Sequence, residues 1–260
     1  ALDLRSGRSR IQVRGEQNGA MNAHATIEVP ALDDWLPDTG GELHGAISAT
    51  GRWPAVKIDG QVRGSSLRMS TASVQTLALD FDIEEPKQPR GQVTLDASAI
   101  SGGGLTFDTM RLRAGGDIKQ HTLQFDATGQ PLATHLQLRG AGTSPEGAFS
   151  WSGTVEQLVL DVQNAARLQL QQPVDVNYSK TATRISQACF TDGDIRLCLA
   201  GTSEPTGALQ AQYSLQNVPL ALASALATSS MPIDLSGTLD GEGNIQRNAQ
   251  GRLNGSAVIR

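Results

Sequence analysis

Two cysteines are the residues whose spacing most directly suggests chemistry. Cys189 and Cys198 lie on either side of Gly193-Asp194, and glycine at the first position of a two-residue turn favours a type II′ hairpin. Counting outward pairs 189 with 198 at a non-hydrogen-bonded site, where Cα atoms lie about 4.5 Å apart and a disulfide can close. Phe190 and Leu197 then share the apolar face, and the cysteines point to the other. We predict a disulfide formed in an oxidising compartment; two free buried thiols or half of a metal site are the alternatives.

The other residues with catalytic or metal-binding chemistry are scattered. The four histidines fall one per predicted strand, so no metal site is expected: His24, His44, His121 and His135. Carboxylates such as Asp33-Asp34 and Glu84-Glu85 fall in turns or on polar strand faces, which favours solvated charge over a glycosidase pair. Trp35, Trp53 and Trp151 stand in different contexts, which favours packing at strand ends over a sugar-binding platform. Since the sequence has no nucleophile elbow, phosphate-binding loop or zinc-protease motif, we predict a protein that is not an enzyme and uses no cofactor.

The composition provides enough apolar side chains for one face of a sheet but few for a thick two-sided core. Aromatic residues make up 4% of the 260 positions, whereas Gly numbers 28. The net charge of -5 argues against a nucleic-acid partner, because phosphate binding needs a basic surface. The sequence has no window approaching the roughly 18 apolar residues that span a membrane, and nothing resembles a signal peptide. It begins without Met, and we expect a fragment whose targeting and anchoring parts lie elsewhere.

Strict alternation of apolar and polar residues dominates the chain. Residues 77–83 alternate without a slip, and similar runs recur about every 8 to 14 residues, separated by turn signals at 102–104, 115–117, 129–131 and 192–194. This pattern predicts an all-β fold, a long antiparallel meander whose strands have one apolar and one polar face. A single Ala/Leu-rich stretch predicts one short helix near 219–227. The apolar positions predicted to lie side by side are Leu77, Leu79, Phe81, Ile83, Val93, Leu95, Met110, Leu112, Leu123, Phe125, Leu136, Leu138, Leu158, Leu160, Leu168, Leu170, Val174, Val176, Phe190, Leu197 and Leu199.

The sequence also contains a long internal repeat. Residues 19–32 and 207–220 share a frame that begins with Gly-Ala and ends with Val-Pro and Leu. Downstream, a Leu-x-Gly-x-apolar pattern that ends in glycine occurs at 43–51 and again at 235–243. A period of about 190 residues indicates a repeat architecture. We predict that residues 1–206 form one nearly complete repeat and that 207–260 begin the next, continuous with the first.

With these patterns in place, the sequence resembles the TamB family, the inner-membrane-anchored component of the translocation and assembly module, and the wider AsmA-like group. The resemblance covers most of the chain and rests on patterns, not on a catalytic motif. It is carried by WSGTVEQL (151–158), LQLQQP (168–173), ACF (188–190), LCLAG (197–201) and GTLDG (237–241). We expect the family's transmembrane anchor and conserved C-terminal region to lie outside this segment.

The resemblance implies a curled sheet that forms an open, U-shaped hydrophobic groove (a β-taco) in the periplasm. It implies an inner-membrane anchor outside this chain and an outer-membrane barrel partner of the TamA type. Two roles in outer-membrane biogenesis follow from it: assembly of outer-membrane proteins or autotransporters, which belongs to protein secretion, and phospholipid transport. The family has no catalytic residues to carry over.

Physical chemistry supports a lining role independently. A sheet with one aliphatic face must bury that face against a second sheet, against itself or against a ligand. Because aromatic residues are scarce, the face is smooth and rich in Leu and Val. Such a face would accept phospholipid acyl chains without specific recognition. Unfolded outer-membrane protein strands alternate in the same way and are the alternative passengers. A passive structural spacer is the remaining alternative.

Overall fold

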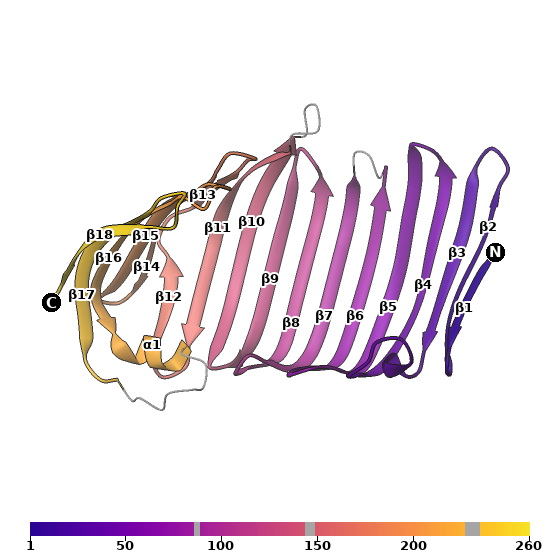
Figure 1. Cartoon of the computed structure of the whole chain (residues 1–260), viewed down its shortest axis with the longest axis horizontal. Coiled ribbons are helices and arrows are strands. Elements are labelled where there is room, and N and C mark those ends of the chain that lie inside the picture. Colours follow the sequence, from indigo (N-terminus) through magenta and orange to yellow (C-terminus); the bar gives the residue numbers. More distant parts are fainter. Residues whose placement is uncertain (86–88, 144–148, 227–234) are drawn as a thin grey trace. The chain divides into compact units, whose positions relative to one another are not determined.

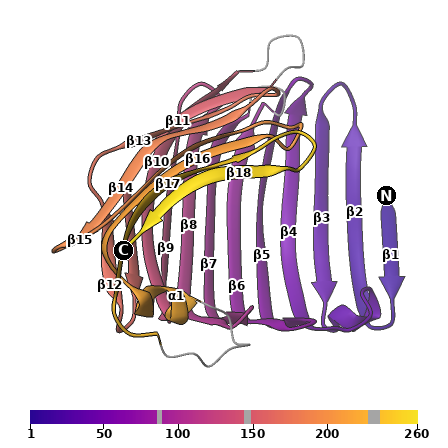
Figure 2. The same cartoon turned by 60° about the vertical axis from the view of Figure 1, so that its left-hand side comes forward.

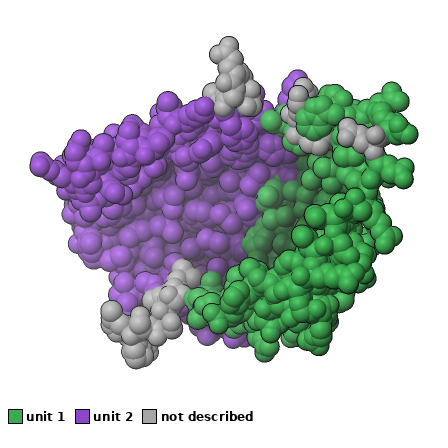
Figure 3. Space-filling model, turned by 45° about the vertical axis from the view of Figure 1, so that its right-hand side comes forward, with its two compact units in different colours: residues 1–118, 123–129 green, residues 119–122, 130–260 purple. Residues whose placement is uncertain are grey.

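The computed structural model describes residues 1–85, 89–143, 149–226 and 235–260. The described chain is almost entirely antiparallel β-structure, with one α-helix and one 3₁₀ helix (Figure 1). It divides into two compact units, which are coloured separately in Figure 3. Unit 1 comprises residues 1–118 and 123–129, and unit 2 comprises residues 119–122 and 130–260.

Unit 1 is an antiparallel meander in which each strand from β1 to β8 pairs with the next along the chain. A 3₁₀ helix, η1 (Leu32–Asp34), connects β3 to β4. The strands are β1 (Leu2–Ser6), β2 (Ser9–Gln17), β3 (Met21–Val29), β4 (Thr39–Arg52), β5 (Ala55–Met69), β6 (Ala72–Glu84), β7 (Arg90–Gly102) and β8 (Leu105–Asp117), with most of β9 (His121–Gln130).

Unit 2 continues the same antiparallel pattern but contains a helix. Its helix α1 (Leu220–Leu226) lies between β16 and β17, where the sequence predicts one. The strands are β10 (Leu132–Thr143), β11 (Ser150–Val162), β12 (Ala166–Leu170), β13 (Val174–Tyr178), β14 (Thr183–Asp192), β15 (Ile195–Ser203), β16 (Leu209–Pro219), β17 (Thr238–Arg247) and β18 (Leu253–Ile259). The predicted repeat boundary at 206/207 falls in the turn between β15 and β16, and the division into repeats stays a prediction.

The strands β12 and β13 together occupy one strand position. Both pair with β11, β12 along its second half and β13 along its first half, and both also pair with β14. Pro173 stands between them and has no N–H to donate to a neighbouring strand. The sheet therefore breaks this strand at the proline and resumes at Val174.

The sheet of unit 2 curls toward one of its faces. The helix α1 contacts both β11 and β16, which are not paired with each other, because β12 to β15 lie between them in the sheet. A short helix reaches two separated strands only if the sheet bends around it. Figure 2 shows β14 to β18 curving along their length.

One predicted turn is wrong. Residues 115–117 belong to β8, which runs to Asp117. Gly116 pairs with Gly91 of β7, and both have positive φ, 121° and 157°. Two facing glycines extend the ladder here because neither has a side chain that resists this backbone conformation.

Candidate functional site

Apolar side chains form continuous rows across unit 1, each row following direct partners from strand to strand. One row crosses all eight strands from β1 to β8 and consists of Leu4, Ile11, Ile27, Gly45, Val62, Leu79, Leu95 and Leu112. A neighbouring row consists of Leu2, Val13, Ala25, Ile47, Gly60, Phe81, Val93 and Ala114. Direct partners in an antiparallel sheet point to the same side, so both rows lie on one face, the apolar face of unit 1.

The opposite face of unit 1 carries cross-strand ion pairs. Arg63 reaches Asp80 at 2.8 Å, and Lys57 reaches Asp82 at 2.9 Å. Arg111 of β8 contacts Asp96 of β7 at 2.7 Å, and this carboxylate raises the pKa of Arg111. Exposed ion pairs stabilise a protein only slightly. Their charged side chains show that this face is exposed to water. The apolar face is therefore the one that must be covered by a ligand or by another part of the protein.

The apolar face of unit 1 is only partly covered by protein atoms. The side chains of Leu79, Leu95 and Leu112, direct partners in one row, are each half-buried. Among the described residues of unit 1, the fully buried apolar side chains are Val29, Ala31, Val56 and Ala127. A face covered by a second protein layer would bury its inward side chains completely. The rows therefore leave a broad aliphatic surface within reach of a ligand.

The alternation of faces is interrupted at one level across β5 to β8, a feature that we call the crease. It adds four residues to the apolar face that the sequence prediction missed. Ser66 and Ala99 have φ of 50° and 45°, and the register omits both of them. A Cβ on Gly64 would lie 2.9 Å from Leu67 Cδ1, so Leu67 shares the apolar face, although strict alternation places it on the other. Direct partners share a face, so the row that begins with Leu67 lies on the apolar face as a whole. Its members are Leu67, Val74, Ile100 and Phe107.

The predicted lining residues of unit 1 lie on this face. Leu77, Ile83 and Met110 belong to its rows through their partners on β5 and β7. On β9, Leu123 and Phe125 alternate with Thr128, whose hydroxyl bonds to Thr109 on the polar side at 2.7 Å. The sharing of one face is therefore observed. A role in holding a ligand stays a prediction.

Unit 2 has an apolar face with a buried cluster at its centre. The fully buried members are Ala166, Leu168, Val174, Ala188 and Phe190. Around them pack Val155, Leu158, Leu160, Leu170, Val176, Ile195, Leu197 and Leu222. The remaining predicted residues extend the same face by direct pairing, Leu136 with Leu158, Leu138 with Val155 and Leu199 with Ala188.

The helix α1 partly covers this cluster. Leu222 packs against the buried residues, and the Leu220 N–H donates a hydrogen bond to the Gly237 carbonyl at 3.0 Å. A helix of seven residues is too short to be stable alone in water. Its packing on the apolar face therefore maintains it, and the face of unit 2 is occupied here by the chain itself.

The cysteines form the predicted disulfide at the predicted register. Cys189 pairs directly with Cys198, and their Cα atoms are 4.0 Å apart. Phe190 and Leu197 pair beside them on the apolar face, as expected. Gly193 has φ of 57°, which a tight hairpin turn requires. The bond therefore links β14 to β15 on the polar face, where Arg196 Nε donates to Cys198 Sγ at 3.3 Å.

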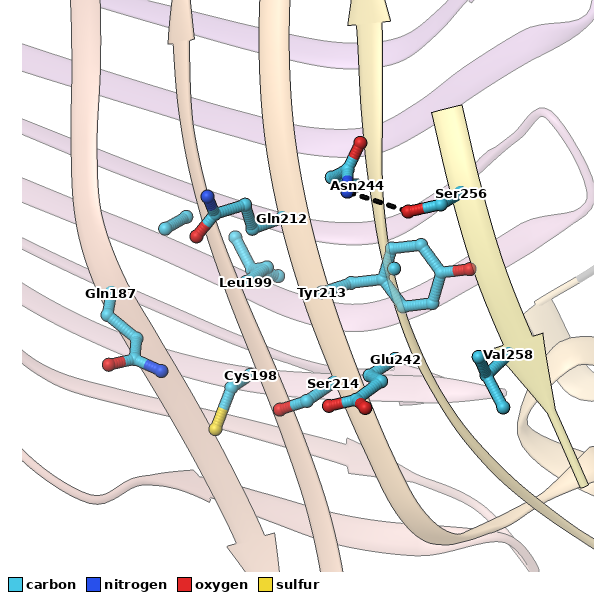
Figure 4. Close-up of a pocket in the computed structure, with 12 residues that line it drawn as sticks. Gln187, Cys198, Leu199, Gln212, Tyr213, Ser214, Glu242, Asn244, Ser256 and Val258 are labelled. Carbon is cyan, nitrogen blue, oxygen red and sulfur yellow. Dashed lines mark hydrogen bonds between the residues drawn. The ribbon is translucent and has the colours of Figure 1, made fainter. Parts of the chain in front are cut away.

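A depression lies over β14 to β18 and includes Cys198 of the disulfide in its lining (Figure 4). Cys198, Ser214 and Glu242 form one row of direct partners across its floor. Beside them the Asn244 amide donates to the Ser256 hydroxyl at 2.8 Å. Its lining also includes Leu199 and Val258, so the depression combines polar and apolar groups.

Within the described ranges, no group of three or more His, Cys, Asp or Glu side chains is arranged to hold a metal ion. In the same ranges, every helix is too short or too polar to cross a membrane.

Comparisons with known proteins place the chain in a family. The model of the TamB N-terminal domain matches residues 1–259. The chain is 21% identical over 247 residues to the translocation and assembly module subunit TamB of Haemophilus influenzae, an alignment that covers 94% of this chain and 19% of that protein. The chain thus spans about a fifth of that relative's length. No solved structure matches the chain significantly. Since the family model covers nearly every residue, the chain belongs to the TamB N-terminal domain family.

Proposed function

We propose that the apolar faces of this chain provide a surface along which phospholipid acyl chains pass between the inner and outer membranes. The observation that carries the proposal is the set of apolar rows that cross every strand from β1 to β8, whose side chains are half-buried or exposed. Each buried CH₂ is worth about 0.8 kcal/mol, so an acyl chain of about sixteen carbons loses on the order of 12 kcal/mol of favourable burial in bare water. A continuous aliphatic face offsets that loss along the whole path.

The lining also suits a passenger that moves. The rows consist of Leu, Ile, Val, Ala and Gly with occasional Phe, and three cross-strand ion pairs lie on the opposite face of unit 1. A site with placed polar groups would hold its ligand at one position. A uniform aliphatic face makes neighbouring positions nearly equal in energy, which lets an acyl chain slide.

The family supports the cellular setting of this proposal. The relative is a subunit of a translocation and assembly module. We propose that this chain lies in the periplasm and is anchored in the inner membrane through a region outside the given sequence. Its partner in the module would be an outer-membrane protein of the TamA type. In this role the chain acts as a non-enzymatic conduit.

Site-specific crosslinking would test the passenger. A photo-reactive amino acid at Leu79, in the central row of unit 1, should give phospholipid adducts in cells. The matched control is Gln61 on the neighbouring strand, which is exposed on the polar face opposite Asp80 and should give none. Polypeptide adducts at Leu79 without lipid would contradict the proposal and favour a chaperone for outer-membrane strands.

Charge substitution would separate a conduit from a spacer. Leu79→Arg and Leu95→Arg together place two cations in the rows and should abolish complementation of a deletion strain. Thr94→Arg, on the polar face of the same sheet, should leave it unchanged. Full activity of the double variant would show that length alone matters.

A further inference from the structure

Three aromatic side chains gather at one end of the apolar face of unit 2. Trp151 of β11 pairs directly with Tyr178 of β13. The ring of Phe149 lies 6.2 Å from that of Tyr178, centroid to centroid. The chain has ten aromatic residues (5 Phe, 3 Trp, 2 Tyr), so three in one place contrast with the aliphatic rows elsewhere.

The indole of Trp151 lies flat across two strands. A Cβ on Gly140 or Gly153 would come within 2.5 Å and 2.3 Å of the Trp151 ring, and these two glycines are direct partners. The ring therefore packs directly on the backbone of these two glycines, because any larger residue there would clash with it. Its N–H donates to His121 Nε2 at 2.7 Å, and the planes of the two rings are inclined by 28°. The indole thus presents a flat apolar surface with its polar group already satisfied.

Pairing fixes the face on which these rings lie. Val155 packs against the buried cluster, and positions 153 and 151 follow it by alternation along β11. Tyr178 follows Val174 and Val176 along β13 in the same way. Phe149 and Tyr178 remain 43% and 47% exposed, so the aromatic end of this face is open to a ligand.

The turn after Tyr178 carries one positive charge, that of Lys180. Ser179 organises this turn by accepting a hydrogen bond from the Ala182 N–H at 3.1 Å, and Lys180 is exposed within it. Aromatic rings with polar tips prefer the boundary between hydrocarbon and polar groups. A cation beside them complements a phosphate.

From these observations we infer that Phe149, Trp151 and Tyr178 form a binding site for the glycerol region of a phospholipid, with its phosphate toward Lys180 and its acyl chains along the aliphatic cluster. This inference rests on the proposed function and deepens it, because it fixes where the polar end of the passenger sits. The rings hold the polar–apolar boundary, and Lys180 adds electrostatic attraction for the phosphate.

Fluorescence quenching of Trp151 tests the placement. The full chain carries Trp35→Phe and Trp53→Phe, leaving Trp151 as the reporter; the Trp35 indole N–H has no hydrogen-bond partner in the described chain, so its loss removes no such bond. Lysophosphatidylglycerol brominated near the glycerol end of its chain should quench Trp151 more strongly than the same lipid brominated near the methyl end. Equal quenching, or stronger quenching from the methyl end, would overturn the inference.

Substitutions provide the second measurement, with affinity read by calorimetry. Phe149→Ala with Tyr178→Ala should weaken binding about tenfold, and Lys180→Gln about threefold. The controls are Trp53→Ala and Lys57→Gln, an exposed aromatic and a polar-face cation in unit 1, and both should leave affinity unchanged. Lysophosphatidylglycerol binding that does not respond to the Phe149, Tyr178 and Lys180 variants would refute this site and leave the conduit standing. Absence of any lipid binding would overturn the conduit itself.

Discussion

The two units share a sheet pattern and treat their apolar faces differently. In unit 1 the aliphatic rows from β1 to β8 are half-covered, and the fully buried apolar residues among those described are few. In unit 2 the sheet bends around α1, and Leu168 and Phe190 sit in a buried cluster. One alternation pattern therefore supports two outcomes, an open face and a partly filled one. Curvature and a covering helix decide between them.

The connectors between strands show the same contrast. In unit 1, η1 is tied to the turn between β1 and β2 by polar contacts, because the Asp34 carboxylate accepts hydrogen bonds from the Arg8 N–H and the Ser9 hydroxyl. In unit 2, α1 is held mainly by burying Leu222. A polar anchor at one connector leaves the sheet face free, whereas an apolar anchor occupies it.

Truncating one leucine in each unit should give the largest difference. Leu168→Ala removes a side chain that is 2% exposed and should lower the free energy of unfolding by about 3 kcal/mol, since the cavity cannot collapse fully. Leu95→Ala in the open rows should lower it by about 1 kcal/mol, because water already reaches that side chain. Urea denaturation of each variant measures both. Equal losses would mean that the face of unit 1 is covered in solution.

Removing the disulfide should destabilise unit 2 by a slightly smaller amount. Cys189→Ser with Cys198→Ser opens a short loop in the unfolded chain, and the chain-entropy model gives about 2–3 kcal/mol. Reduction of the wild-type protein with a dithiol should shift the urea midpoint in the same direction. A matched change in the unit 1 ion pairs, Lys57→Gln, should shift the urea midpoint much less, because this ion pair is exposed. A larger effect from Lys57→Gln would reverse the comparison of how the units are held.

Alternation and turn chemistry predicted most of the architecture because both are local. The hairpin around Gly193 fixed the pairing of Cys189 with Cys198, and the Pro-initiated Ala/Leu run placed α1 within a residue or two. The sharing of one face by the predicted apolar residues follows from the same periodicity. The hairpin, the helix and the shared face all depend on residues that are close in sequence, so their residue types form a recognisable pattern.

The crease could not be predicted because it depends on backbone conformations that the sequence does not mark. Ser66 and Ala99 adopt positive φ without being glycine, and each interrupts the alternation just before an apolar residue, Leu67 on β5 or Ile100 on β7. Val74 and Phe107 lie on the same face as their direct partners on these two strands. The aromatic end of unit 2 was missed for a related reason. Gly140 and Gly153 look like weak strand residues until Trp151 is seen to lie over them.

The crease itself should respond to a single methyl group. Ala99→Gly relieves a left-handed conformation that costs an L-residue about 1 kcal/mol, and after the extra entropy of glycine the net stabilisation should be about 0.5 kcal/mol. Ala97→Gly, two residues earlier on the same strand and at ordinary φ, should instead destabilise by about 0.5–1 kcal/mol. Opposite signs in urea denaturation would locate the crease at position 99. Two losses of similar size would place β7 in regular alternation throughout.

The polar anchor of η1 should show itself in the pH dependence of stability, the smallest of these effects. The hydrogen bond from Ser9, with a further one from the Arg8 N–H, holds the pKa of Asp34 below its ordinary value. In the unfolded chain the pKa of an Asp is about 3.9. The stabilisation from Asp34 is therefore fully present above that pH, and it is lost as the pH falls through the lower pKa of the folded state. Asp34→Asn should therefore be less stable than wild type at neutral pH, and the gap in urea midpoints should narrow on acidification. Asp33→Asn is the neighbouring control and should run parallel to wild type. If the Asp34→Asn gap stays constant down to acid pH, the anchor is steric, and the contrast between the connectors of the two units lies in packing alone.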